Sequence, residues 1–259
     1  MKIIILHRKL LASILLLCLL FLSLLFYFTM PNSFAIELTT NSVMEESLRE
    51  EITTLTKKDE KIAYLTFDDG PTLKATEKIL DILKEEDVKA TFFVVGKHVK
   101  EHPELVKRAY EEGHYLANHG YHHDNKKLYS SNENFISEIK NTDIEIGKAI
   151  GIENYCSHVF RFPNGYMSSH YKAKKKEAAK LLSDINYTYI DWNCLNNDSV
   201  KKYSSAQLLK NLKKSAKNKG TLVILMHDTS DVNDTPSILK DSITYLKEQG
   251  YEFRNFYHF

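Results

Sequence analysis

Polar side chains that could perform chemistry interrupt the apolar runs of this chain at five places. The five clusters are Asp68-Asp69-Gly70-Pro71, Asn118 to His123, Arg161 to Gly165, Asp191-Trp192 and His227-Asp228. Carboxylates and imidazoles are common ligands of divalent metal ions, and the same groups transfer protons during hydrolysis. Each cluster alone has an ordinary interpretation, since Asp-Asp-Gly-Pro, for example, is a turn sequence. A catalytic site is indicated only if the fold brings the clusters together.

Each cluster follows or ends a predicted β-strand. From Lys61 onward, β-branched and aromatic runs alternate with longer amphipathic segments, which indicates parallel βαβ units. The expected strands are 62–67, 90–95, 114–118, 157–162, 187–192, 221–226 and 251–254. The expected helices are 73–86, 103–112, 132–150, 170–185, 204–218 and 234–248, with glycines 113, 151, 220 and 250 near their ends. This pattern predicts an α/β barrel or a doubly wound sheet, and both gather the carboxyl ends of the strands at one edge.

The sequence argues against several other classes of protein. Neither GxGxxG nor GxxxxGK[ST] occurs, so a nucleotide is not an expected partner. The formal net charge is +1, from 35 basic and 34 acidic residues, which argues against nucleic acid as a partner. A peptidase of the HExxH type is not supported because that motif is absent. Cys156 and Cys194 are expected near opposite ends of the sheet and therefore as free thiols.

Five ordered motifs give the chain a resemblance to a known family. TFDDGP, H-x-x-x-H, R-F-P-x-G, D-W and L-x-H follow one another between residues 61 and 259. In this order they resemble the polysaccharide deacetylase family, which carries the NodB-homology domain and is also called carbohydrate esterase family 4. The resemblance implies an α/β fold, a distorted (β/α)7-type barrel, and a metal-dependent hydrolase that removes acetyl groups from a glycan.

The resemblance implies a metal site of three residues. Asp69, His119 and His123 would bind a divalent ion, expected to be Zn²⁺, with Co²⁺, Ni²⁺ or Fe²⁺ as alternatives. His122 is a competing ligand, although the i+4 spacing of the family motif favours His123. Gly120 departs from the family pattern, which usually has Ser or Thr after the first histidine, and so removes a hydroxyl that could support the loop.

The resemblance also implies the acid–base residues. Asp68 would be the general base, with Arg161 as its charge partner. His227 would be the general acid, held in orientation by Asp191. A carboxylate bonded to the imidazole would raise the pKa of His227 and keep it protonated. Asp198 is given no catalytic role.

Substrate contacts are implied by the third and fourth motifs. The backbone N–H near Asn164 would stabilise an oxyanion, Trp192 would line the acetyl pocket, and Pro163 belongs to the same binding region. The expected substrate is N-acetylglucosamine of peptidoglycan, with N-acetylmuramic acid, chitin oligosaccharides and acetylxylan as alternatives. A non-catalytic glycan-binding module is the other possibility, but such a module should have lost one of the site residues, and all of them are present.

The first 60 residues carry a separate prediction. Residues 1–35 are expected to be a membrane anchor or a signal segment, because an apolar run over residues 10–30 follows a basic flank. Both interpretations export the rest of the chain, either tethered to the cell membrane or secreted after cleavage behind Ala35. Residues 36–60 are expected to be a solvated linker that is partly helical, from the spacing of Leu48, Ile52 and Leu55. Residues 61–259 are expected to be the catalytic domain.

Overall fold

Residues 44, 46–229 and 234–257 are described by a computed structural model, and all of them lie in the unit Leu38–Phe259. The predicted membrane segment, residues 10–30, and the cleavage site behind Ala35 lie outside the described residues. Within the described part of the chain, no helix combines the length and the apolar character that a membrane span requires.

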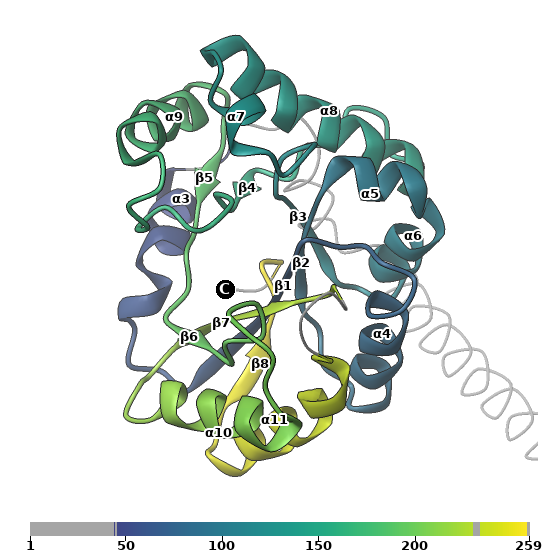
Figure 1. Ribbon diagram of the computed structural model, residues 1–259, viewed down its shortest axis with the longest axis vertical. Coiled ribbons are helices and arrows are strands. Elements are labelled where there is room, and N and C mark those ends of the chain that lie inside the picture. Colours follow the sequence, from purple (N-terminus) through teal and green to yellow (C-terminus); the bar gives the residue numbers. More distant parts are fainter. Residues whose placement is uncertain (1–43, 45, 230–233, 258–259) are drawn as a thin grey trace, which may run out of the picture. The chain divides into compact units, whose positions relative to one another are not determined.

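Parallel strands make up the centre of this unit. They are β1 (Ile62–Asp68), β2 (Thr91–Val94), β3 (Tyr115–Asn118), β4 (Val159–Phe160), β5 (Thr188–Tyr189), β6 (Cys194–Leu195), β7 (Leu222–His227) and β8 (Glu252–Arg254). They form one sheet in the order β5-β4-β3-β2-β1-β7-β6, with β8 beside the first half of β1. Figure 1 shows that the sheet curls into a ring with helices outside it.

The ring is an open barrel. The order of hydrogen-bonded strands begins with β5 and ends with β6, and the sheet does not close between these two strands. The α/β class and the parallel pairing are confirmed, but the count of seven strands is wrong. The additional strand is β6, which pairs with β7 through Cys194 and Leu195. It was missed because it follows β5 after a few residues with no helix between them.

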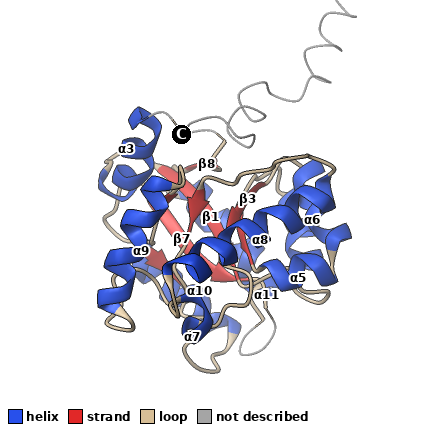
Figure 2. Ribbon diagram, turned by 90° about the horizontal axis from the view of Figure 1, so that it is seen from above, coloured by secondary structure: helices blue, strands red, loops and turns tan. Residues whose placement is uncertain are grey.

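Helices flank the strands on several sides (Figure 2). They are α3 (Glu46–Thr54), the 3-10 turn η1 (Leu55–Lys57), α4 (Thr76–Glu85), α5 (Gly96–Glu101), α6 (Pro103–Glu111), α7 (Asn125–Leu128), α8 (Asn132–Ile150), α9 (Lys172–Asp184), α10 (Ser205–Ala216) and α11 (Pro236–Glu248). All six helices predicted from periodicity are confirmed, with small shifts at their ends. In α4, for example, the spaced residues Ile79, Leu80 and Leu83 are fully buried against the sheet.

Within the predicted linker over residues 36–60, helical structure is present at residues 46–57, but this part is packed and not fully solvated. These residues form α3 and η1, whose Ile52 and Leu55 are 0% and 1% exposed. The Met44 N–H donates to Asn186 Oδ1 at 2.7 Å, and Arg49 donates to the carbonyl of Tyr187, just before β5. The acidic residues of this segment therefore cover the outside of a helix whose apolar side packs on the barrel.

Gly220 does not end a helix in the way predicted. Helix α10 is followed by Asn218 in the left-handed region, at φ 60°. A Cβ atom at Gly220 would lie 2.3 Å from the Cα atom of Asp59, so glycine is required there for close backbone contact.

The free-thiol prediction for Cys156 and Cys194 is confirmed.

Candidate active site

The carboxyl ends of the central strands bring the predicted site residues together. Asp68, the last residue of β1, is aligned with His227, the last residue of β7. Asn118, the last residue of β3, is aligned with Phe160 of β4, and Arg161 follows directly. Because all these strands are parallel, their last residues and the loops behind them share one edge of the barrel.

Asp69, His119 and His123 form the candidate metal centre. Asp69 Oδ1 lies 3.3 Å from His119 Nε2 and 3.1 Å from His123 Nε2. The three ligand atoms all lie within 4.8 Å of one another. The other ring nitrogen of His119, Nδ1, lies 2.8 Å from the carbonyl oxygen of Arg161, which turns Nε2 towards Asp69.

These residues fit a divalent cation. Asp69 Oδ1 is buried and has no hydrogen-bond partner among the described residues, although two imidazole nitrogens lie close to it. Burial alone would raise the pKa of Asp69, but the neighbouring His119 and His123 hold it well below its usual range. An ionised carboxylate and two imidazoles facing one point make a ligand set found for Zn²⁺ and for several transition metals.

His122 is not part of this group. Its Nδ1 atom lies 2.5 Å from Oε1 of Glu138, a buried residue of α8. The structure therefore separates the two adjacent histidines, with His123 facing Asp69 and His122 facing the helix.

Asp68 and Arg161 form a buried ion pair beside the candidate metal centre. Arg161 is 0% exposed, and its Nη1 atom donates to Asp68 Oδ1 at 2.8 Å and to Thr66 Oγ1 at 2.6 Å. Its guanidinium carbon lies 4.0 Å from the ring centroid of Phe93. The second oxygen of Asp68, Oδ2, lies 3.9 Å from His119 Nε2. One oxygen of Asp68 is thus fixed by Arg161 while the other faces the centre.

The predicted partner of His227 is wrong: the carboxylate that holds it belongs to Asp198 and not to Asp191. Asp198 Oδ1 lies 2.7 Å from His227 Nδ1, and Asp198 Oδ2 accepts from the His227 N–H at 2.8 Å. The Asp191 carboxylate instead accepts from the backbone N–H groups of Tyr166 and Met167, at 2.8 and 2.9 Å. Asp191 therefore supports the loop behind β4.

The missed strand β6 explains this error. Asp191 lies just past β5, at one end of the strand order, whereas β6 pairs with β7. The chain leaves β6 at the same edge as the end of β7, so Asp198 reaches His227. The only sequence signal was a second carboxylate behind the Asp-Trp pair, and the residue spacing alone does not show which of the two is adjacent to β7.

The environment of His227 suits a proton donor. Burial alone would lower the pKa of His227, but the hydrogen bond and charge of Asp198, with Asp68 and Asp69 nearby, raise it to about 9. The expectation of a raised pKa is therefore confirmed, with Asp198 as its main cause.

The residues predicted to contact substrate lie around the loop behind β4. Pro163 is buried and Asn164 is exposed, with its Oδ1 accepting from Asn125 Nδ2 at 2.8 Å. The half-buried Trp192 covers Gly165, where a Cβ atom would lie 2.7 Å from the indole ring. Trp192 also lies 5.7 Å from the Arg161 guanidinium. The contacts of Pro163, Asn164 and Trp192 with substrate stay predictions.

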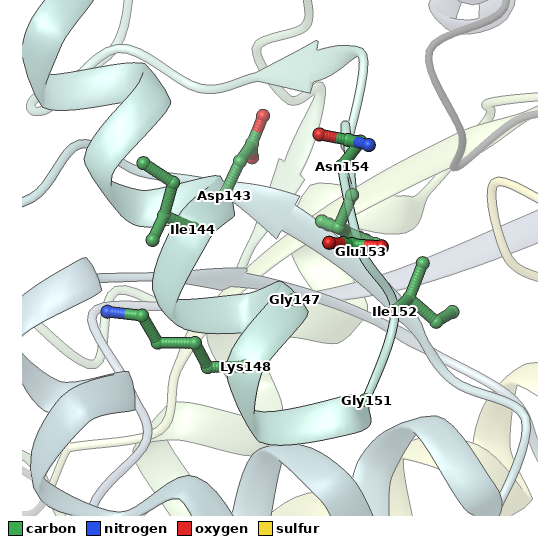
Figure 3. A pocket seen from close by; sticks show the side chains of 9 residues that line it. Asp143, Ile144, Gly147, Lys148, Gly151, Ile152, Glu153 and Asn154 are labelled. Carbon is green, nitrogen blue, oxygen red and sulfur yellow. The ribbon is translucent and has the colours of Figure 1, made fainter.

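A groove beside α8 lies away from this site. Its volume is about 400 Å³, and it is bordered by Ile144 and Lys148 of the helix and by residues 151–155 of the following loop (Figure 3). None of the predicted catalytic or ligand residues lines it. We therefore do not assign chemistry to this groove.

The fold and the site define a class of protein: an open parallel α/β barrel with hydrolase-type acid and base groups around a potential metal centre. The sequence profile of the polysaccharide deacetylase family matches residues 56–189. The chain belongs to this family of hydrolases that deacetylate glycans.

Named relatives and a solved structure agree with this assignment. A peptidoglycan-N-acetylglucosamine deacetylase of Bacillus cereus is 38% identical over 205 residues, covering 77% of this chain and 71% of the relative. A peptidoglycan-N-acetylmuramic acid deacetylase of Bacillus subtilis is 33% identical over 196 residues, covering 76% and 70%. The structure of a CE4 esterase from Streptococcus mutans is similar with a TM-score of 0.70 and 30% identity, covering 84% of this chain and 92% of that one.

Proposed function

We propose that this chain is a metal-dependent deacetylase that removes N-acetyl groups from N-acetylglucosamine residues of peptidoglycan. One observation carries the proposal: the Asp68–Arg161 pair and the Asp198–His227 pair both lie beside Asp69, His119 and His123 at one edge of the barrel. A degenerate binding module would be expected to lack at least one of these groups.

The candidate metal centre and Asp68 would together generate the nucleophile. A divalent ion held by Asp69, His119 and His123 would supply a Lewis acid that makes water nucleophilic near neutral pH. Asp68 would take up the proton of the attacking water through Oδ2, because Oδ1 is held by Arg161. The fixed guanidinium keeps this carboxylate in one orientation, so its second oxygen is available for proton transfer.

His227 would complete the hydrolysis as the general acid. With a pKa of about 9, the imidazole is protonated at neutral pH. Asp198 occupies Nδ1, so Nε2 is the nitrogen that would donate a proton to the departing amine as its bond to the acetyl carbon breaks. A carboxylate base and a protonated imidazole acid beside one centre are the groups that amide hydrolysis needs.

The choice of substrate rests on the relatives. The relative with 38% identity is named for N-acetylglucosamine in peptidoglycan, and the one with 33% identity for N-acetylmuramic acid. The test is acetate release from purified peptidoglycan and from N-acetylglucosamine oligomers, followed by identification of the free amino sugar. Glucosamine in the product supports the proposal, whereas muramic acid would assign the activity to the other sugar. No acetate from either substrate, with metal supplied, would contradict both.

We also propose that residues 10–30 anchor the enzyme in the cell membrane, with the catalytic domain outside the cytoplasm. The apolar length of this segment suits a bilayer, and the basic residues before it favour that orientation. Membrane fractionation of the full chain, with and without residues 1–35, tests the anchor. A mature N-terminus at residue 36 would show instead that the segment is removed.

A further inference from the structure

One buried carboxylate supports the loop between β3 and α7, which carries both histidines of the candidate metal centre. Glu138 of α8 accepts from the N–H groups of Tyr121 and His122, each at 2.9 Å, through Oε2. Its Oε1 atom lies 2.5 Å from His122 Nδ1, and the residue is only 7% exposed. We propose that Glu138 is a positioning residue that fixes this loop so that His123, and not His122, joins the metal centre.

The backbone of this loop needs such support. Gly120 and His123 both lie in the left-handed region, at φ 81° and 52°. Non-glycine residues in that region persist only where their surroundings hold them. Between the two turns, the N–H groups of residues 121 and 122 point to the same acceptor, Glu138 Oε2. A side chain at Gly120 could have supplied a hydroxyl, and here the support comes from the neighbouring helix.

Helix α8 also holds the start of the loop. Asn118 Oδ1 accepts from the Gly120 N–H at 2.9 Å, while Asn118 Nδ2 donates to the Ile139 carbonyl at 2.9 Å and to Asp143 Oδ1 at 3.0 Å. The helix has 19 residues, and its inner side is buried. The loop is therefore attached at two points to one rigid element, which is how a ligand loop keeps its geometry without a metal.

The same carboxylate separates two adjacent histidines. His122 and His123 follow each other in the chain, and each has an imidazole that could bind a divalent ion. Glu138 engages Nδ1 of His122, whereas His123 Nε2 lies 3.1 Å from Asp69 Oδ1. Without Glu138, the His122 ring would lose its partner and two backbone donors would lose their acceptor. The loop could then present either histidine to the metal centre.

This inference rests on the proposed metal site, and its test measures metal binding instead of catalysis. The full chain is prepared without metal as wild type, Glu138→Ala and Glu138→Gln. The matched control is Glu133→Gln, at an exposed position of the same helix. Zn²⁺ affinity is measured by competition with a chromophoric chelator, and the visible spectrum of the Co²⁺-loaded protein reports the ligand set.

We expect Glu138→Ala to weaken Zn²⁺ binding by about 10- to 100-fold, the usual cost of losing a group that orients a ligand. Glu138→Gln retains an oxygen acceptor without the charge, so its affinity should fall between those of Glu138→Ala and the wild type. The control should bind as the wild type does. The Co²⁺ spectrum of Glu138→Ala should change, and Glu138→Ala/His122→Ala should return it towards that of the wild type.

Wild-type affinity in both Glu138 variants would overturn the inference while leaving the metal site intact. An altered spectrum that persists in the double variant would contradict the selection between His122 and His123. A wild-type chain that binds neither ion would remove the metal site and the inference together. If Glu138→Ala does not fold, the comparison of Glu138→Gln with Glu133→Gln decides the question.

Discussion

Asp198 and His227 form a hydrogen-bonded pair, with 2.7 Å between Asp198 Oδ1 and His227 Nδ1. The second oxygen of Asp198 accepts from the backbone N–H of the same histidine and from Thr235 Oγ1. One oxygen of this buried carboxylate thus holds the imidazole and the other holds the backbone of the same histidine, which fixes the ring and leaves Nε2 as the nitrogen for proton transfer. Asp198 is a positioning residue in this arrangement.

The pH dependence of activity should follow this pair. Replacing Asp198 with Asn removes the charge that raises the pKa of His227, so that pKa should fall from about 9 to near or below its ordinary value of 6.5. The general acid would then lose its proton at a lower pH. The alkaline limb of the pH profile of kcat/KM should therefore move to lower pH by about 2 pH units. Asp191→Asn, which alters a carboxylate without contact to His227, is the control. An unchanged alkaline limb in Asp198→Asn would exclude His227 as the acid.

Thermal stability should show the same linkage. A histidine whose pKa is raised by folding stabilises the protein fully below pH 6.5, and this contribution is lost as the pH rises through 9. The difference in melting temperature between wild type and Asp198→Asn should therefore become smaller as the pH rises from 6.5 to 9.

Asp68→Asn should abolish acetate release while Zn²⁺ remains bound. The amide cannot take up a proton from water, so the rate should fall by at least about 100-fold. The three candidate ligands are unchanged, and metal content measured by elemental analysis should stay at the wild-type level. Asp69→Asn is the comparison, because it should lose metal and activity together. An active Asp68→Asn enzyme would disprove the role of Asp68 as the base.

The two adjacent histidines should differ in their effect on metal content. His123→Ala removes a ligand that lies 3.1 Å from Asp69 Oδ1, so the purified protein should contain little metal. His122→Ala removes a ring that faces Glu138, and metal content should remain near that of the wild type. A chelator should inactivate the wild type, and added divalent ion should restore it. Retention of metal by His123→Ala, or its loss in His122→Ala, would reverse the ligand assignment.

Stability at acid pH should depend on His114, which directly precedes β3, whereas His119 of the candidate metal centre follows the other end of that strand. Burial lowers the pKa of His114 to about 4, and the Nδ1 atom accepts from the Ala90 N–H at 3.1 Å. The neutral ring is therefore favoured in the folded state, and its contribution to stability is present above pH 6.5 and lost as the pH falls towards 4. Up to about 3 kcal/mol is involved.

Denaturant unfolding at a series of pH values tests this, with His114→Gln as the variant. The variant lacks the titrating ring, so its free energy of unfolding should fall less between pH 6.5 and 4 than that of the wild type. If the free energy of unfolding falls equally with pH in the two proteins, another group causes the loss of stability at acid pH.

Helix α3 should contribute to the stability of the catalytic unit. Ile52 is fully buried, and Ile52→Ala should lower the free energy of unfolding by about 2 to 5 kcal/mol. Ile144→Ala is the matched control, because Ile144 is 51% exposed and its truncation should have a small effect. Equal effects in the two variants would mean that residues 46–57 are a detachable linker after all.

Local patterns in the sequence predicted most of the elements correctly. The apolar spacing in α4 and the β-branched run of β1 each specify an element through neighbours a few residues away, so the sequence contains the required information. The short strand β6 and the packing of α3 on the barrel were not predicted. Cys194 and Leu195 form a strand because β7 lies beside them, and α3 packs beside β5, so both depend on partners distant in the chain.

The sequence by itself determined the chemistry available to this protein: two adjacent aspartates behind a strand, histidines four residues apart, and a buried-strand histidine at residue 227. It also determined that these groups would meet at one edge, because parallel strands align their carboxyl ends. The tertiary structure alone decided which groups are partners. Strand pairing placed Asp198 rather than Asp191 at His227, and packing against α8 separated His122 from His123. Such choices depend on contacts between segments far apart in the chain, which residue type and spacing do not encode.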